Sequence, residues 1–212
     1  MSQFEQLSAA VIKGDKQTAV AETKKAVDAQ ANVQDILDNG LIAAMDEVGK
    51  QFAAGKLFVP QMLRSAKTMQ ECMQVIKPLF TEGQISSKGK VLIGTVKGDL
   101  HDIGKNLVAM MMEGAGFAIT DLGVDVPAEK FVQKVQEIEP DLLGMSALLS
   151  ITMPAMPETI KALEQAGVRD KVKVMVGGAP VTAKYADEVK ADGYAPDAAS
   201  AVIQAKKLLG IS

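Results

Sequence analysis

The sequence has little of what a disulfide scaffold, a membrane protein or a nucleic-acid-binding protein requires. Its single cysteine, Cys72, excludes an internal disulfide and any site built from several thiolates. No apolar run approaches the roughly 18 to 20 residues that span a bilayer, and the start Met1–Glu5 lacks the basic and apolar stretches of a signal peptide. A formal net charge of −3 gives no electrostatic case for nucleic acid or for an anionic membrane surface. These absences predict a cytoplasmic protein with no nucleic-acid and no membrane partner.

What remains is an ordinary globular composition. Of the 212 residues, 48% are hydrophobic and 23% are charged, and there are 12 methionines but only one histidine. Methionine in a chain with 4% aromatic residues is typical of a gap-filling core, and a soft binding pocket is the alternative interpretation. The length allows one large domain or two small ones.

The first part of the chain, residues 1–85, carries helical spacing throughout, with apolar residues three and four positions apart. The segments with this pattern are 4–12, 16–29, 33–52 and 60–80. The pair Asn39-Gly40 is typical of a helix break, but it also fits inside a helix. We predict a compact bundle of four helices as a first domain.

A polar stretch rich in glycine and serine, residues 81–90, is the best linker candidate in the chain. After it, short apolar runs alternate with helical patterns of about 10 to 15 residues. The expected strands are 91–96, 117–122, 142–147, 173–176 and 193–195. The expected helices are 105–113, 127–139, 154–166, 184–190 and 197–209. This alternation predicts an α/β domain over residues 89–212, with a flavodoxin-like (Rossmann-like) five-stranded parallel sheet. In such sheets ligands bind outside the carboxyl ends of the strands.

The loop after the first expected strand contains the only histidine. Asp99 and His101 are one residue apart, so in an extended loop the carboxylate can fix the imidazole tautomer and leave the other ring nitrogen as a donor. Gly98 and Gly104 allow a ligand to approach closely. The alternative is a surface loop in which Asp99 or Asp102 caps the next helix. One histidine with one carboxylate makes no closed zinc or iron site, so a metal on His101 would take most of its ligands from a macrocycle.

The loops after the third and fourth strands carry weaker signals. Ser146, Ser150 and Thr152 share one face of an expected extended segment, with Leu148 among them; the alternative is a hydroxyl cap for the following helix. The pair Gly177-Gly178 permits a flat ligand to lie on bare backbone, but it also makes an ordinary turn. No G-x-G-x-x-G follows the first strand and no P-loop motif is present, so dinucleotide binding has little support.

Together these loops resemble the cobalamin-binding family typified by the B12 domain of methionine synthase and by the small corrinoid proteins of methyltransferase systems. The family motif D-x-H-x-x-G stands at residues 99–104, S-x-L at 146–148 and G-G at 177–178. The first domain is similar to the helical cap of that family, with Phe52 followed by the run 55–62, Gly-Lys-Leu-Phe-Val-Pro-Gln-Met. The resemblance spans nearly the whole chain and implies a four-helix cap at residues 1–85 and a B12-binding α/β domain at residues 89–212.

The resemblance also implies roles for individual residues. Cobalamin (methylcobalamin or another corrinoid) would bind base-off and His-on, with His101 as the lower cobalt ligand. Asp99 would hydrogen-bond His101 and carry its proton, and Thr152 stands where the family has a serine in this relay. Phe52 and Val59, the latter commonly leucine, would cover the methyl face of the corrin; the alternative for both is core packing. The other implied contacts, including those beside the threaded nucleotide tail, are Gly98, Leu100, Asp102, Ile103, Gly104, Ser146, Leu148, Ser150, Gly177, Gly178, Tyr194 and Ala198.

The implied function is that of a methyl carrier. It would take a methyl group on cobalt from a substrate-specific methyltransferase of the methanol, methylamine, betaine or aryl methyl ether class. It would pass that group to a second methyltransferase that uses tetrahydrofolate or coenzyme M, and a reductive activase would be a further partner. With no room for a catalytic barrel, the chain would be one subunit of a multi-component methyltransferase rather than a complete enzyme.

Three alternatives compete with the methyl carrier. A cobalamin-dependent sensor is one, although no helix-turn-helix or basic stretch is apparent. A small subunit of an adenosylcobalamin mutase is a second, and the cap argues against it. A cofactor-free flavodoxin-like regulator is the third, and it leaves the residues of the three loops unexplained.

Overall fold

The computed structural model describes residues 4–79 and 87–211. The chain divides into two compact units. The helical unit comprises the chain up to Ser87 together with Gly114–Gly116, and the α/β unit comprises Lys88–Glu113 and Phe117–Ser212. In the described ranges no helix combines the length and the apolar character needed to cross a bilayer.

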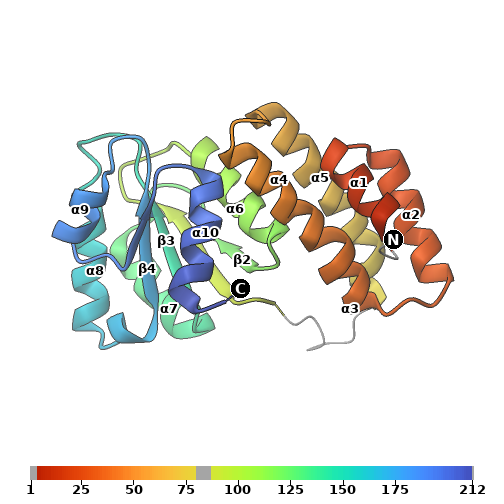
Figure 1. Cartoon of the computed structure of the whole chain (residues 1–212). Coiled ribbons are helices and arrows are strands. Elements are labelled where there is room, and N and C mark those ends of the chain that lie inside the picture. Colours follow the sequence, from red (N-terminus) through yellow and green to blue (C-terminus); the bar gives the residue numbers. More distant parts are fainter. Residues whose placement is uncertain (1–3, 80–86, 212) are drawn as a thin grey trace. The chain divides into compact units, whose positions relative to one another are not determined.

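The helical unit is the predicted bundle (Figure 1). Its elements are α1 (Glu5–Lys13), α2 (Lys16–Asp28), α3 (Val33–Asp35), the π-helical η1 (Ile36–Ile42), α4 (Ala43–Ala53), α5 (Val59–Ile76) and the 3₁₀ turn η2 (Lys77–Leu79). The pair Asn39-Gly40 does not break the chain, because η1 joins α3 to α4 in one continuous helical segment. A Cβ on Gly40 would lie 2.9 Å from Leu7 Cδ2, so glycine allows α1 to pack against η1. Phe80 and residues 81–86 of the predicted linker lie outside the described residues.

The methionines are mostly core residues in both units. Eight of them are at most 4% exposed: Met45, Met62, Met69, Met111, Met112, Met145, Met156 and Met175. In the α/β unit, Met145 and Met156 belong to the same buried cluster as Leu143 and Leu163. The gap-filling interpretation of the methionine content therefore holds for these positions.

The α/β unit contains a five-stranded sheet of order β2-β1-β3-β4-β5, in which every pairing is parallel. The strands are β1 (Lys90–Thr95), β2 (Ala118–Asp121), β3 (Leu142–Ser146), β4 (Lys173–Gly177) and β5 (Gly193–Ala195). The helices are α6 (Ile103–Gly114), α7 (Ala128–Ile138), α8 (Ala155–Gln165), the 3₁₀ turn η3 (Arg169–Lys171), α9 (Ala183–Glu188) and α10 (Ala198–Leu209). This is the predicted flavodoxin-like topology.

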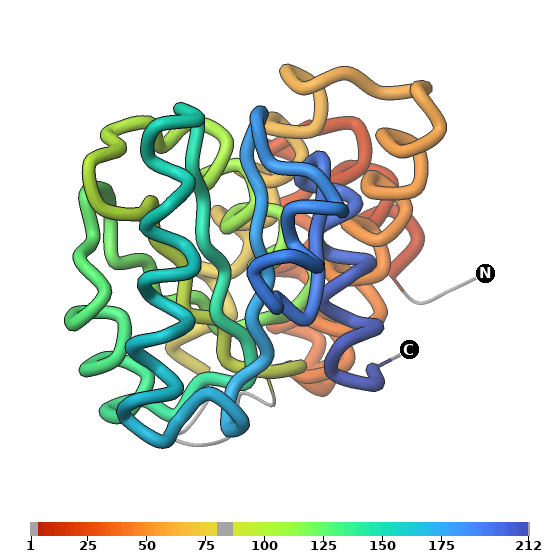
Figure 2. Tube along the Cα trace, turned by 90° about the vertical axis from the view of Figure 1, so that its left-hand side faces the viewer, coloured from red at the N-terminus to blue at the C-terminus, as the bar shows by residue number. Residues whose placement is uncertain are grey.

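Helices cover both faces of this sheet (Figure 1). On one face α7 and α8 run side by side (Figure 2), and α9 follows them, with Phe131, Met156 and Ile160 packed on the sheet. Because both faces are covered, the central strands are mostly apolar, and β1 is buried from Val91 to Thr95. A Cβ on Gly94 would lie 2.9 Å from the Phe131 ring, so glycine in β1 makes room for that aromatic side chain.

The strand order places the expected ligand site. The chain passes from β1 to β2 on one side, and then to β3 on the other side of β1. The loops that follow β1 and β3 therefore leave the sheet in opposite directions, which defines a topological switch point. These two loops carry the D-x-H-x-x-G and S-x-L motifs, at residues 99–104 and 146–148.

Candidate functional site

The centre of the site is the carboxylate of Asp99, which is fully buried. Its Oδ1 accepts hydrogen bonds from the backbone N of His101 (3.0 Å) and from His101 Nδ1 (2.8 Å). Its Oδ2 accepts from Thr152 Oγ1 (2.7 Å) and from the backbone N of Leu148 (2.7 Å) and Leu149 (3.2 Å). One side chain thus joins the loop after β1 to the loop after β3.

These donors determine the charge of Asp99. Burial is the largest single influence and would raise the pKa of the carboxyl. The hydrogen bonds from Thr152, from the backbone of His101 and Leu148, and from the His101 ring together outweigh it, and they hold the pKa of Asp99 well below its usual range. At neutral pH Asp99 is therefore an anion that can only accept.

The charge of Asp99 in turn assigns the tautomer of His101. A carboxylate that only accepts requires the proton of the 2.8 Å contact to be on Nδ1. In the neutral imidazole, Nε2 then keeps its lone pair, and half of the side chain is exposed. The backbone of His101 is held as well, because Thr95 Oγ1 donates to its carbonyl at 3.0 Å. An oriented imidazole with one free nitrogen is the arrangement of an axial metal ligand.

The segment after β3 corrects one prediction. We expected residues 146–152 to be extended, whereas the chain after Ala147 forms a series of bends and turns up to Pro154. The cause is the buried Asp99 carboxylate, because the backbone must curl for the N–H groups of Leu148 and Leu149 and the hydroxyl of Thr152 to reach one oxygen. Thr152 is consequently 7% exposed, while Ser150 lies exposed in the turn.

The structure distinguishes the glycines of the motifs. Gly178 has φ +123°, and a Cβ there would lie 1.9 Å from the carbonyl oxygen of Ala147. The backbone of this chain therefore itself requires glycine at 178. A Cβ on Gly104, in the first turn of α6, would meet nothing within 4 Å. The packing of the protein therefore does not explain a glycine at position 104.

Exposed apolar side chains lie on the loop that contains His101, at the start of α6 and on the loop after β3. Leu100 and Leu148 are 71% and 44% exposed, and Ile103 and Ile151 are about as exposed as surface polar residues, at 85% and 84%. Large aliphatic side chains clustered in water are unfavourable, and they commonly mark a binding surface. In the described ranges no three His, Cys, Asp or Glu side chains gather to hold a metal ion. The residues therefore suit an apolar macrocycle that brings its own metal and takes one ligand from the protein.

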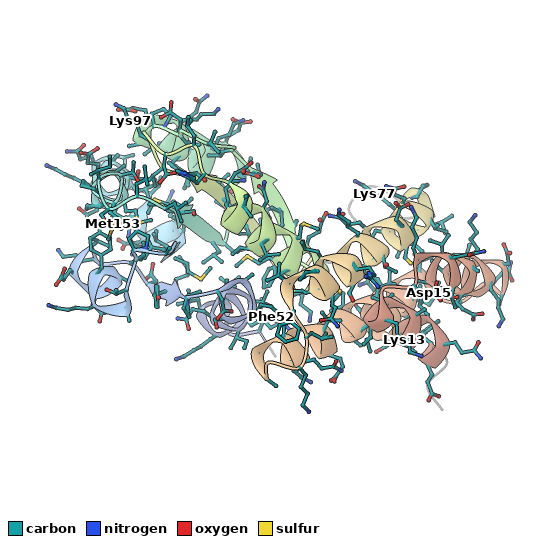
Figure 3. The ribbon with its side chains drawn as sticks, turned by 90° about the horizontal axis from the view of Figure 1, so that it is seen from above. Lys13, Asp15, Phe52, Lys77, Lys97 and Met153 are labelled. Carbon is teal, nitrogen blue, oxygen red and sulfur yellow. The ribbon has the colours of Figure 1, made fainter. Side chains whose placement is uncertain are left out.

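Other residues expected at the site follow from the topology. Ser146, Gly177 and Tyr194 lie on neighbouring strands, since Ser146 pairs with Gly177 in the β3–β4 register and Tyr194 follows in β5. Ala198 is buried at the start of α10. Asp102 lies just before α6, where its backbone carbonyl accepts from Asn106 N at 2.7 Å and its Oδ2 accepts from the side-chain amide of Asn106 at 3.0 Å. Neither contact is a side-chain cap of a backbone N–H, so they do not confirm the helix-cap alternative for Asp102. Lys97 and Met153 mark the loops after β1 and β3 in Figure 3.

The two expected cap residues belong to the helical unit. Phe52, also labelled in Figure 3, lies half-buried near the end of α4, and Val59 is the first residue of α5, 41% exposed. Phe58 beside it is 68% exposed, and its backbone N donates to Oε1 of Gln61 at 2.9 Å. Neither Phe52 nor Val59 is a core residue of its unit.

Three residues that support the loop with His101 (the histidine loop, residues 96–102) were not predicted from the sequence. Asp121 is the last residue of β2, Asp125 lies in the loop that follows it, and Lys105 lies in the first turn of α6 with its side chain 1% exposed. A lysine on the buried stripe of a helix, with Val108 and Met112 one and two turns later, is a signal that was available in the sequence. The position of Asp125 had no such signal, because its contacts depend on the packing of two loops.

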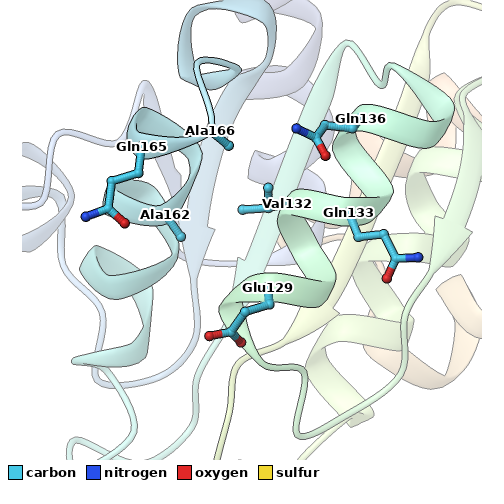
Figure 4. Close-up of a pocket in the computed structure, with 7 residues that line it drawn as sticks. All are labelled: Glu129, Val132, Gln133, Gln136, Ala162, Gln165 and Ala166. Carbon is cyan, nitrogen blue, oxygen red and sulfur yellow. The ribbon is translucent and has the colours of Figure 1, made fainter.

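A shallow groove lies elsewhere on the α/β unit, between α7 and α8 (Figure 4). Its volume is about 390 Å³. Its lining residues are Glu129, Val132, Gln133, Gln136, Ala162, Gln165 and Ala166. None of them belongs to the loops after β1, β3 and β4, so this groove is not part of the candidate site.

Comparison with known proteins decides the family. A family described as B12 binding domain matches residues 89–203, and a second family of the same description matches residues 3–77. The chain belongs to the B12-binding family. The dimethylamine corrinoid protein 1 of Methanosarcina acetivorans is 43% identical over 207 residues, which cover 97% of each chain. The trimethylamine corrinoid protein 1 of the same organism is 41% identical over 197 residues, which cover 92% of this chain and 91% of the relative.

Among solved structures, the methanol:cobalamin methyltransferase complex MtaBC of Methanosarcina barkeri matches with a TM-score of 0.88 at 29% identity. The match covers 99% of this chain and 80% of that one. The cofactor of this B12-binding chain is accordingly a corrinoid, and the chain is a corrinoid protein of the kind that serves methyltransferase systems.

Proposed function

We propose that this corrinoid protein is the methyl carrier of a methylamine-type methyltransferase system, with His101 as the lower ligand of cobalt in base-off, His-on cobalamin. The observation that carries the proposal is the 2.8 Å contact between His101 Nδ1 and the buried Asp99 carboxylate. The bound corrinoid supplies the cobalt that accepts a methyl group from one partner and gives it to another. The residues of the chain bind and orient that group.

Each residue of the proposed site has a defined task. Asp99 keeps the proton of His101 on Nδ1 and so presents Nε2 to the metal, while Thr152 Oγ1 donates to the far oxygen of the carboxylate at 2.7 Å. Asp99 would hold the imidazole in this orientation through the 2.8 Å contact to Nδ1. Leu100, Ile103 and Leu148 offer an exposed apolar surface on which a flat macrocycle would rest. Phe52 and Val59 are proposed to shield its methyl face.

The proposed substrate class and partners rest on the relatives. Two of them are named dimethylamine and trimethylamine corrinoid proteins, and the MtaBC complex pairs a corrinoid chain with a methyltransferase. We therefore propose a methylamine-specific methyltransferase as the methyl donor for this chain. A second methyltransferase that uses tetrahydrofolate or coenzyme M, and a reductive activase, complete the proposed system.

The single histidine makes the ligation test unusually direct. Untagged protein reconstituted with cob(II)alamin should give an electron paramagnetic resonance spectrum with three-line splitting from one axial nitrogen. Labelling the protein with nitrogen-15 histidine should convert the three lines to two, because only His101 carries the label. Three lines that persist after labelling would show that the cofactor keeps its own base, and they would overturn the His-on assignment.

The carrier role is tested with partner enzymes. The reduced, cobalamin-loaded protein should change its absorption spectrum when a methylamine substrate and the matching methyltransferase are added. A methanol-specific methyltransferase with methanol is the control and should leave the spectrum unchanged. Methylation by the methanol enzyme alone would refute the substrate class. Failure with every donor, together with a light-dependent change of assembly, would favour the cobalamin-dependent sensor.

Gly104→Ala separates folding from cofactor binding. The new methyl group meets nothing in the protein, and alanine is the better helix former, so the free protein should gain about 0.5–1 kcal/mol in urea unfolding. The same substitution should weaken cobalamin binding at least about tenfold in an equilibrium titration, because the methyl group occupies space against the bound corrinoid. Unchanged cobalamin affinity would mean that Gly104 does not face the cofactor.

A further inference from the structure

The loop after β2 holds the histidine loop at its N-terminal end. The backbone N of Gly98 donates to Asp125 Oδ1 at 2.7 Å, and the backbone N of Asp125 donates to the carbonyl of Asp99 at 2.9 Å. Asp125 makes both contacts from a left-handed conformation, φ +53°, which non-glycine residues seldom adopt. Surrounding contacts must hold such a residue in place. Asp125 thus binds the backbone of both Gly98 and Asp99, which precede His101.

The end of β2 holds the C-terminal end of the histidine loop. The ammonium of Lys105, on a side chain that is 1% exposed, contacts Asp121 Oδ2 at the end of β2. It also donates to Asn106 Oδ1 at 2.7 Å, and the amide of Asn106 donates to Asp102 Oδ2 at 3.0 Å. Asp121 is tied into its own loop, since its Oδ1 accepts from the backbone N of Gly123 at 2.9 Å. A buried ammonium requires such partners, which makes this end of the loop rigid.

We propose that the loop after β2 is the positioning element of His101, with Asp125 as its main positioning residue. The inference rests on the proposed function, in which His101 ligates cobalt. Asp99 fixes the orientation of the imidazole through the contact to Nδ1. The position of the ring relative to the ends of the strands depends on the backbone from Gly98 to His101. Asp125 holds that backbone, and Lys105 with Asp121 holds the residues that follow it. Neither group touches the ring, so their effect on ligation is indirect.

The test compares two substitutions of Asp125. Asp125→Gly removes the acceptor for Gly98 N and tolerates the left-handed φ. Asp125→Asn keeps an acceptor oxygen and also tolerates that φ. With cob(II)alamin bound, Asp125→Gly should lower the equilibrium constant for His101 ligation about tenfold, measured from the nitrogen splitting, because one charge-assisted hydrogen bond is lost. Asp125→Asn should restore most of the ligation.

Asp141→Gly is the matched control, because Asp141 Oδ2 accepts from the backbone N of Lys90 at 2.7 Å at the opposite, amino-terminal edge of the same sheet. It removes one carboxylate-to-backbone hydrogen bond of the same kind and should leave ligation unchanged. An equal loss of ligation in Asp141→Gly and Asp125→Gly would show a global effect and overturn the inference.

The remaining outcomes separate the inference from the proposed function. A wild-type spectrum identical to that of His101→Ala would refute His-on binding and the inference with it. Wild-type splitting that Asp125→Gly retains in full would overturn the inference alone. If Asp125→Gly fails to fold, Lys105→Met serves instead: it keeps the apolar stem and leaves Asp121 partly solvated, at 35% exposure. It should weaken ligation, and unchanged ligation would again overturn the inference.

Discussion

Gly178→Ala should destabilise the protein by about 3–5 kcal/mol or prevent folding of the α/β unit, as for other substitutions that force a backbone clash. The added Cβ would lie 1.9 Å from the carbonyl oxygen of Ala147 and 2.8 Å from its carbonyl carbon. Backbone atoms cannot rotate away from the clash as a flexible side chain can. The φ of +123° adds strain of its own for an L-residue with a side chain. Urea unfolding followed by circular dichroism gives the free energy of unfolding.

Two other glycines of the motifs serve as controls for this prediction. Gly177→Ala places a Cβ 3.1 Å from the carbonyl oxygen of Ala195 and should cost less than Gly178→Ala, because a small shift relieves that contact. Gly104→Ala meets nothing and should not be destabilising. If Gly178→Ala unfolded within about 0.5 kcal/mol of the wild type, the close approach of the loops after β3 and β4 would be wrong.

Asp99→Asn should have the second large effect, a loss of about 2–4 kcal/mol of folding free energy together with loss of His101 ligation. The amide that replaces the carboxylate keeps the shape but carries two donors, and the donors of Thr152, Leu148 and His101 already converge on this side chain. At least one donor would then face another donor in a buried place. Asp141→Asn is the matched control, because Asp141 is exposed and its Oδ2 accepts from the backbone N of Lys90, away from the loops after β1 and β3.

The pH dependence of stability gives an independent test of the Asp99 environment. The pKa of Asp99 is lowered on folding, so its ionised form stabilises the native state. This contribution is present in full above the pKa of an unfolded aspartate, about 4. It is lost progressively as the pH falls below about 5, towards the lower pKa of the folded state. The unfolding free energy of the wild type should therefore fall more steeply between about pH 5 and pH 2 than that of Asp99→Asn. Parallel curves would contradict the lowered pKa.

The sequence alone determined the local structure of this protein. The helical spacing of residues 1–85, and the alternation of buried strands with helices after them, follow from the contacts of each segment with its own neighbours and with a common core. Those patterns led to the correct class, order and approximate bounds of the elements. The pairing of Asp99 with His101 was also predictable, since two residues one apart in a loop meet without help from the rest of the chain.

The tertiary structure decided what depends on contacts between loops. Thr152 meets Asp99 across 53 positions of sequence because β1 and β3 are neighbours in the sheet, and that contact curls a segment expected to be extended. The need for glycine at 178 and the contacts made by Asp125 arise in the same way, from backbone of one loop packing on backbone of another. Such contacts leave no periodic pattern in the sequence, because they depend on which strands lie side by side rather than on any local preference. The role of His101 could be proposed from the sequence, whereas the contacts of Asp125 and of Lys105 with Asp121 that support its loop could not.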